Sequence, residues 1–97
     1  MKDLNHTTWH QFISDSTKFS VDDQHCLLDL VLTAKEQQAI TTRLKIFTEL
    51  LHGQKSQREL ASQLSVSIAT ITRCSNYLSH MSTSEYQRIK SLLHHSN

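Results

Sequence analysis

The sequence contains no proline and only one glycine, Gly53, among its 97 residues. The many tight turns of β sandwiches and barrels are usually built from these two residue types. Their scarcity makes a β-rich fold improbable and favours helices. The sequence therefore predicts an all-α protein, and its length allows one small domain that spans residues 1–97.

A chain of this size gains limited stability from its own core. A domain of about 100 residues buries only roughly 60–65% of the surface that its unfolded chain exposes. In addition, residues 27–32 are apolar on nearly every side of a helix, and such a helix has to be buried. We therefore expect a second subunit to cover this segment.

Serine and threonine residues mark the expected helix starts. A first helix is expected from Thr8 to about Lys18, and a second begins after Ser20, which precedes two aspartates that suit a helix N-terminus. Residues 33–36, 56–59 and 82–85 each have the Ser/Thr-x-x-Glu spacing of a capping box. These motifs predict the starts of the third, fourth and sixth helices.

The remaining helix ends follow from single residues. The third helix is expected over residues 34–52, because Gly53 suits the left-handed cap just past the last apolar turn. Residues 65–67 interrupt the fourth helix, and Ser67 caps a fifth that runs to Leu78. Six short helices without a strand account for nearly the whole chain.

Residues 57–73 have the pattern of a helix-turn-helix, which we place at about 56–78. Two helices that cross steeply need a small residue at the crossing, as Ala61 is, and apolar residues in the turn and in the second helix, as Val66 and Ile71 are. The second helix of such a motif enters the major groove of DNA. The outward-facing residues are then Ser67, Ile68, Ala69 and Thr72. An αα-hairpin that merely packs, with Ile68 in its core, is the alternative.

The same region closely resembles the bacterial tryptophan repressor family. The resemblance covers residues 9–94 and is carried by residues 30–33, 42–43, 49–53, 56–59, 68–73 and 75–76. It implies an intertwined homodimer of six-helix subunits that binds a palindromic operator in double-stranded DNA. The DNA-contacting residues that pattern and resemblance indicate are Thr42, Gln57, Arg58, Ser67, Ile68, Ala69, Thr70, Thr72 and Ser75.

The resemblance also implies an amino-acid effector, L-tryptophan, as co-repressor. Arg43 and Arg73 would flank the indole ring, and guanidinium planes do stack on aromatic faces. Thr33, with the backbone of Leu30 and Leu32, would hold the polar end of the effector across the subunit interface. The site is completed by Cys74 and Tyr77.

Three positions depart from the family pattern. Cys74 stands where the family usually has glycine, Tyr77 where it usually has serine, and Ala61 where well-known members carry lysine. A thiol and a phenol would narrow the effector pocket, so we expect weak tryptophan binding. A different small ligand, or none, is the alternative. Because Ala61 lacks the lysine amine that is available to DNA in those members, we expect a different operator affinity or sequence preference.

Other functions are less well supported. Nothing is spaced as a nucleophile elbow, a phosphate loop or a carboxylate pair, so no enzyme is expected. His6 and His10, like His94 and His95, lack further ligands for a metal. No segment is long enough to cross a membrane, and Cys26 and Cys74 form no CxxC motif, so we expect a cytoplasmic protein with reduced thiols.

The charge is divided unevenly along the chain. Residues 1–52 contain five Lys/Arg and seven Asp/Glu, whereas residues 53–97 contain five and two. The basic C-terminal half suits a polyanion such as DNA. It also leaves a protein-interaction module that docks an acidic partner as an alternative.

Overall fold

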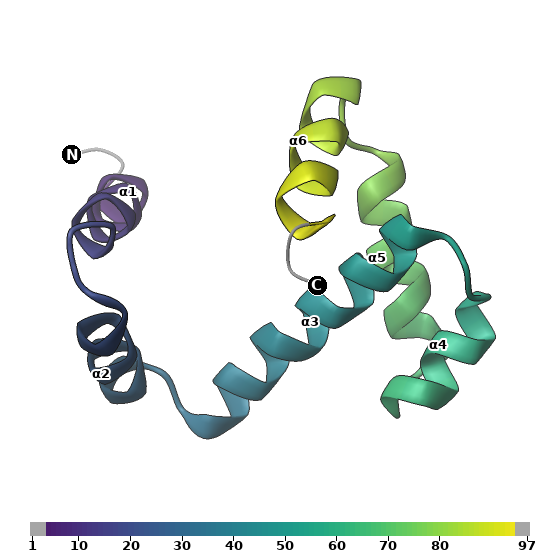
Figure 1. Ribbon diagram of the computed structural model, residues 1–97, viewed down its shortest axis with the longest axis horizontal. Coiled ribbons are helices and arrows are strands. Elements are labelled where there is room, and N and C mark those ends of the chain that lie inside the picture. The colour runs from purple at the N-terminus through teal and green to yellow at the C-terminus, as the bar shows by residue number, and fades with distance from the viewer. Residues whose placement is uncertain (1–3, 95–97) are drawn as a thin grey trace. The chain divides into compact units, whose positions relative to one another are not determined.

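The computed structural model describes residues 4–94, with side chains from Thr8 to Leu93. This part of the chain consists of helices and contains no strand (Figure 1), which confirms the predicted all-α class. The helices are α1 (Leu4–Ser16), α2 (Val21–Val31), α3 (Ala34–His52), α4 (Gln57–Leu64), α5 (Ile68–Ser79) and α6 (Thr83–His94).

The chain divides into two units, with the boundary between Gln37 and Gln38 in α3. The first unit contains α1, α2 and the first turn of α3. The second contains the rest of α3 together with α4, α5 and α6.

The predicted helix caps are confirmed. In residues 33–36, 56–59 and 82–85, the backbone N–H of the Ser or Thr donates to the Glu carboxylate at 2.8–3.1 Å. The Glu backbone N–H donates to the Ser or Thr hydroxyl oxygen at 3.0–3.2 Å. Ser20 and Ser67 cap α2 and α5 in the simpler one-bond way. Gly53 follows α3 with φ of 69°, as its cap position requires.

The expected start of α1 is wrong, and its end lies two residues before the expected one. The helix starts at Leu4 rather than Thr8, because the residues between them include neither proline nor glycine to interrupt it. It ends at Ser16 rather than Lys18. There the backbone N–H groups of Lys18 and Phe19 donate to carbonyls three residues back, which forms a turn. The hydroxyls of Ser16 and Thr17 also donate to carbonyls three residues back.

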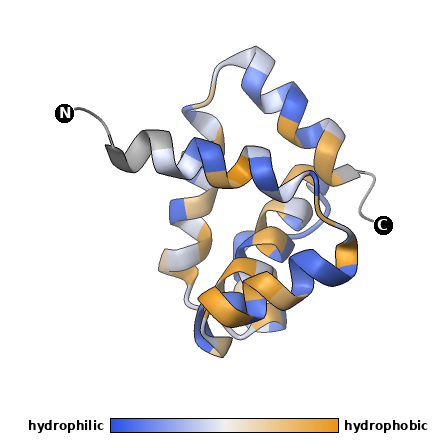
Figure 2. Ribbon diagram, turned by 90° about the vertical axis from the view of Figure 1, so that its left-hand side faces the viewer, coloured by the Kyte–Doolittle hydropathy of each residue, from blue (hydrophilic) through white to orange (hydrophobic). Residues whose placement is uncertain are grey.

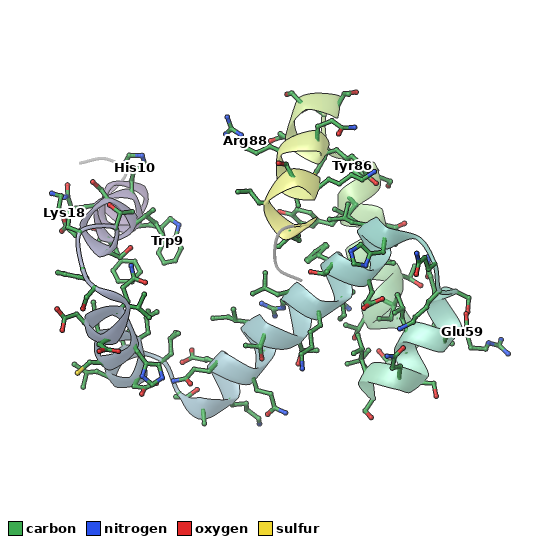
Figure 3. All side chains as sticks on the ribbon, in the orientation of Figure 1. Trp9, His10, Lys18, Glu59, Tyr86 and Arg88 are labelled. Carbon is green, nitrogen blue, oxygen red and sulfur yellow. The ribbon has the colours of Figure 1, made fainter. Side chains whose placement is uncertain are left out.

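The first unit buries none of its described side chains. The Trp9 ring packs against the ring of Phe12, with centroids 5.6 Å apart, but Trp9 is still 63% exposed (Figure 3). Leu30 is 80% exposed, and Leu27 and Leu28 are half-buried. None of the residues in the apolar segment 27–32 is thus buried in the single chain, and Leu30 and Val31 are exposed.

The second unit has a core where α3, α4 and α5 meet. Figure 2 shows the pattern behind it, with hydrophobic residues recurring between hydrophilic ones along the helices. The buried cluster consists of Ile46, Leu60, Ala61, Ile71 and Cys74, with Phe47, Leu50, Leu64 and Val66 packed against it. Ala61 is therefore buried as predicted for the crossing, and Ile71 is fully buried as predicted for the second helix.

Candidate nucleic-acid interface and effector site

The turn between α4 and α5 is fixed by its backbone. Ser65 adopts the left-handed conformation, with φ of 57° and ψ of 44°. The Ser65 N–H donates to the Ser62 carbonyl at 3.3 Å, and the Val66 N–H donates to the Ala61 carbonyl at 3.0 Å. These two bonds form a Schellman motif, and Val66 supplies its hydrophobic contact by packing against the core cluster. The turn therefore holds α5 at a defined angle to α4.

One face of α5 is buried and the opposite face is exposed. Ile71 and Cys74 point into the core. Ser67, Ile68, Ala69 and Thr72 are exposed, as predicted. Ile68 is 46% exposed, so it is not part of the core of this chain. A helix with small exposed side chains can approach base edges closely.

The exposed hydroxyls of α5 already have partners within the motif. The Ser67 Oγ accepts the Thr70 N–H at 3.1 Å, and the two hydroxyls lie 2.9 Å apart. The Thr72 hydroxyl donates to the Gln57 side-chain oxygen at 2.9 Å, which joins α5 to the first residue of α4. The sequence had assigned Gln57 and Thr72 to DNA contact, but nothing in it signalled that they bond to each other.

The other predicted DNA-contacting residues lie on three helices. Arg58 is exposed on α4, Ser75 is half-buried on α5, and Thr42 is half-buried on α3. Arg58 is next to Glu59, whose labelled side chain lies at the start of α4 in Figure 3. The pKa of Glu59 is lowered by the backbone N–H and the hydroxyl of Ser56 and by the charge of Lys55. The start of α4, beside Arg58, is thus capped by hydrogen bonds between Ser56 and Glu59.

Three of the predicted effector residues influence one another electrostatically. Burial raises the pKa of the Cys74 thiol, and the positive charges of Arg43 on α3 and Arg73 on α5 oppose that rise. The thiol is therefore within electrostatic range of both guanidinium groups. Both arginines are exposed, and among the described residues no carboxylate pairs with either of them. The pair can accept an anionic or aromatic ligand.

Cys74 and Tyr77 have different surroundings. Cys74 is 9% exposed and belongs to the core cluster. Tyr77 is 67% exposed and lines a shallow surface pocket with His80, Met81 and Glu85. Of the two, only Tyr77 places a large side chain in open space.

The remaining effector residues belong to the first unit. Leu30 is 80% exposed and Leu32 is half-buried. The Thr33 hydroxyl oxygen accepts the Glu36 N–H in the cap of α3. That oxygen has a second lone pair, and the hydroxyl proton is available to a ligand.

No cluster of three or more His, Cys, Asp or Glu suited to a metal ion occurs among the residues whose side chains are described. The side chains of His6, His94 and His95 lie outside that part of the chain. None of the described helices is both long enough and apolar enough to cross a membrane.

Comparison with known proteins identifies the family. Residues 7–93 match the family described as "Trp repressor protein". Three similar proteins are each described as a "Trp operon repressor homolog". The one from Vibrio vulnificus is 42% identical over 91% of this chain and 87% of its own length. The one from Vibrio campbellii is 40% identical over 88% and 86%, and the one from Histophilus somni is 36% identical over 96% and 89%.

These matches span nearly the whole of each protein, including the helix-turn-helix and the long helix before it. The family consists of transcriptional regulators and not of enzymes. The chain therefore belongs to the Trp repressor family.

Proposed function

We propose that this protein is a sequence-specific DNA-binding transcriptional repressor that acts as a homodimer with L-tryptophan as co-repressor. The observation that carries the proposal is the exposed face of α5, formed by Ser67, Ile68, Ala69 and Thr72 and held in place by the Schellman turn and the buried core. Since its target is the chromosome, the protein acts in the cytoplasm.

The charge distribution supports DNA as the partner. The C-terminal half carries the excess of Lys and Arg, and Arg58 is exposed beside the reading helix. Arginines at the flanks of such a helix contact phosphates and set its register, whereas side chains on the exposed face read the bases.

The homodimer accounts for the uncovered apolar residues. In the first unit no described side chain is buried, and in α3 Ile40 and Leu44 are 43% and 47% exposed. Isolated helices of this length are marginal in water, so these surfaces need a partner to be stable. A second copy joins the two units of each chain into one folded domain over residues 1–97. Its two-fold symmetry also predicts a palindromic operator.

The arginine pair supports tryptophan as the effector. Arg43 on α3 and Arg73 on α5 both act electrostatically on the Cys74 thiol, and neither has a carboxylate partner among the described residues. Guanidinium groups bind aromatic faces and carboxylates, and tryptophan offers both. Leu30, Leu32 and Thr33 of the partner subunit complete the site at the amino-acid end.

The test is a selection of binding duplexes from a random library in the presence of L-tryptophan, followed by titration of the selected operator with and without it. We expect enrichment of a palindrome and tighter binding with tryptophan. Indole-propionate, which lacks the amino group, and other amino acids serve as controls. Thr72→Ala and Ile68→Ala should each reduce discrimination by about 1–3 kcal/mol. Failure to enrich any sequence would contradict the DNA-binding proposal.

A regulator that needs no tryptophan is the second candidate, and the exposed Tyr77 favours it. By the family resemblance, its phenol would stand where the amino group of the effector is expected. In that case the operator titration gives the same affinity with and without tryptophan. A protein-interaction module would instead ignore duplex DNA even at low salt, where phosphate binding is strongest.

A further inference from the structure

The hydrogen bond between Gln57 and Thr72 links the two helices of the motif on the surface that faces DNA. Thr72 is exposed in the second turn of α5, and Gln57 is the first residue of α4. The Thr72 hydroxyl donates to the Gln57 Oε1 at 2.9 Å. Among the described residues, no other side-chain hydrogen bond is recorded between these two helices.

Gln57 is well anchored. It follows Ser56, and the capping box formed by Ser56 and Glu59 fixes the backbone at this point with bonds of 2.8 and 3.0 Å. Its side chain therefore starts from a defined position. The bond to Thr72 then orients the amide, with the oxygen toward Thr72 and the NH₂ group on the opposite side.

The direction of this bond determines what each group can offer to DNA. A threonine hydroxyl has one proton and two lone pairs, and a glutamine amide has two donors on its nitrogen. Because the Thr72 proton is used in the bond to Gln57, Thr72 offers only lone pairs. The Gln57 nitrogen still offers both donors. Phosphate oxygens only accept hydrogen bonds, so Thr72 cannot donate to them in this arrangement.

We propose, as a step that rests on the proposed DNA binding, that Gln57 is a positioning residue that makes Thr72 a hydrogen-bond acceptor toward DNA. Thr72 then recognises a donor in the major groove, namely the N4 amino group of cytosine or the N6 amino group of adenine, directly or through water. The Gln57 amide supplies the complementary donor to a phosphate or to a base acceptor.

The first experiment measures the ratio of affinities for the selected operator and a scrambled duplex. Gln57→Met and Thr72→Val each remove the bond, and we expect each to lower the ratio by about two- to tenfold. In the Thr72→Val background, Gln57→Met should lower the ratio less than it does alone, because there is no longer a Thr72 hydroxyl for Gln57 to orient. Thr72→Ser keeps the hydroxyl and should restore the ratio.

Two controls separate positioning from a general effect on folding. Gln63→Met makes the same change at an exposed position of α4 and should leave the ratio unchanged. Urea unfolding of every variant reports stability. A bond that only ties the helices together would lower stability and weaken binding to both duplexes equally, with no change in the ratio, and that result would overturn the proposal.

The second experiment tests the direction of the bond. Purine in place of adenine removes the N6 amino group, and 2-pyrimidinone in place of cytosine removes the N4 amino group. We expect one such replacement in the operator to weaken binding of the wild-type protein about two- to tenfold. The same replacement should not change the affinity of the Thr72→Val variant. If instead a methylphosphonate replacement behaves in this way, Thr72 donates to a phosphate and the proposal is wrong.

The outcomes also distinguish this proposal from the one on which it rests. A wild-type protein that selects no duplex overturns both. A wild-type protein that discriminates its operator while the Gln57→Met and Thr72→Val effects simply add overturns only the positioning role of Gln57.

Discussion

Cys74 stands where the family usually has glycine, and replacing it should show how much its side chain contributes to the free energy of unfolding. The Cys74 side chain is 9% exposed and packs in the core with Ile46, Leu60 and Ile71. Cys74→Ala removes the sulfur, which costs ~0.8 kcal/mol for a buried group of methylene size and somewhat more for the cavity it leaves. Cys74→Gly also removes the β-carbon and places glycine inside α5, which adds about 1 kcal/mol.

The expected losses are thus about 1–1.5 kcal/mol for Cys74→Ala and about 2–3 kcal/mol for Cys74→Gly. A chain of this size is stable by only roughly 5–15 kcal/mol. Both losses can be measured by urea unfolding followed by circular dichroism. Several fixed protein concentrations are needed, since the stability of a dimer depends on concentration.

The matched control is Cys26→Ala, because Cys26 is exposed on α2. Surface substitutions usually change stability by less than about 0.5 kcal/mol. If Cys74→Ala is no more destabilising than Cys26→Ala, the thiol does not pack in the core and the reasoning is refuted.

Three further predictions concern other elements. Ser65→Gly should raise the free energy of unfolding by up to about 1 kcal/mol, because glycine adopts the left-handed conformation of this turn without the strain that serine has there. A decrease in the free energy of unfolding, measured in urea, would contradict this. Glu59→Gln should be less stable than wild type at neutral pH. The difference should vanish as the pH falls through the lowered pKa of the Glu59 carboxyl, where its cap bonds lose their charge; thermal unfolding against pH checks it. Leu28→Asp should abolish folding, as circular dichroism would show, because it places a charge in the apolar segment that the second subunit is expected to cover.

The helix starts were predictable because capping is local. A Ser or Thr and the Glu three residues later satisfy each other's backbone groups without help from the rest of the chain. Gly53 likewise ended α3 as expected. The predicted start of α1 at Thr8 was wrong, because Thr8 lies inside the helix with helical residues on both sides. A residue that resembles a cap is a weak signal where nothing before it interrupts the helix.

Ala61 was predicted at the crossing of α4 and α5, but two other features of this region were not predictable. Ser65 adopts a conformation that serine rarely takes, and Val66 stabilises it by packing on the core. The bond between Gln57 and Thr72 joins residues fifteen positions apart. Each requires the angle between two helices, and a sequence pattern gives only the faces that they bury. The resemblance, not the pattern, indicated Arg43 and Arg73 as effector-binding residues.

The two departures from the family pattern, Cys74 and Tyr77, lie in different surroundings. We expected both Cys74 and Tyr77 to narrow a pocket. Cys74 packs in the core, so we expect its thiol to contribute more to the stability of the helix-turn-helix than to the shape of the pocket. Tyr77 is 67% exposed and is free to meet a ligand. The steric conflict with tryptophan should therefore come mainly from Tyr77.

The two single variants test this division. Overfilling a packed site costs about 1–3 kcal/mol, so removing the phenol in Tyr77→Ser should tighten tryptophan binding roughly ten- to a hundredfold in a calorimetric titration. By linkage, tryptophan should then increase operator affinity by a larger factor than in the wild type. Cys74→Gly alone should leave tryptophan affinity nearly unchanged while it lowers stability, and the double variant should bind like Tyr77→Ser. If the gain requires Cys74→Gly, the thiol obstructs the ligand. If the wild type already binds tightly and neither variant improves it, the phenol lies outside the effector site.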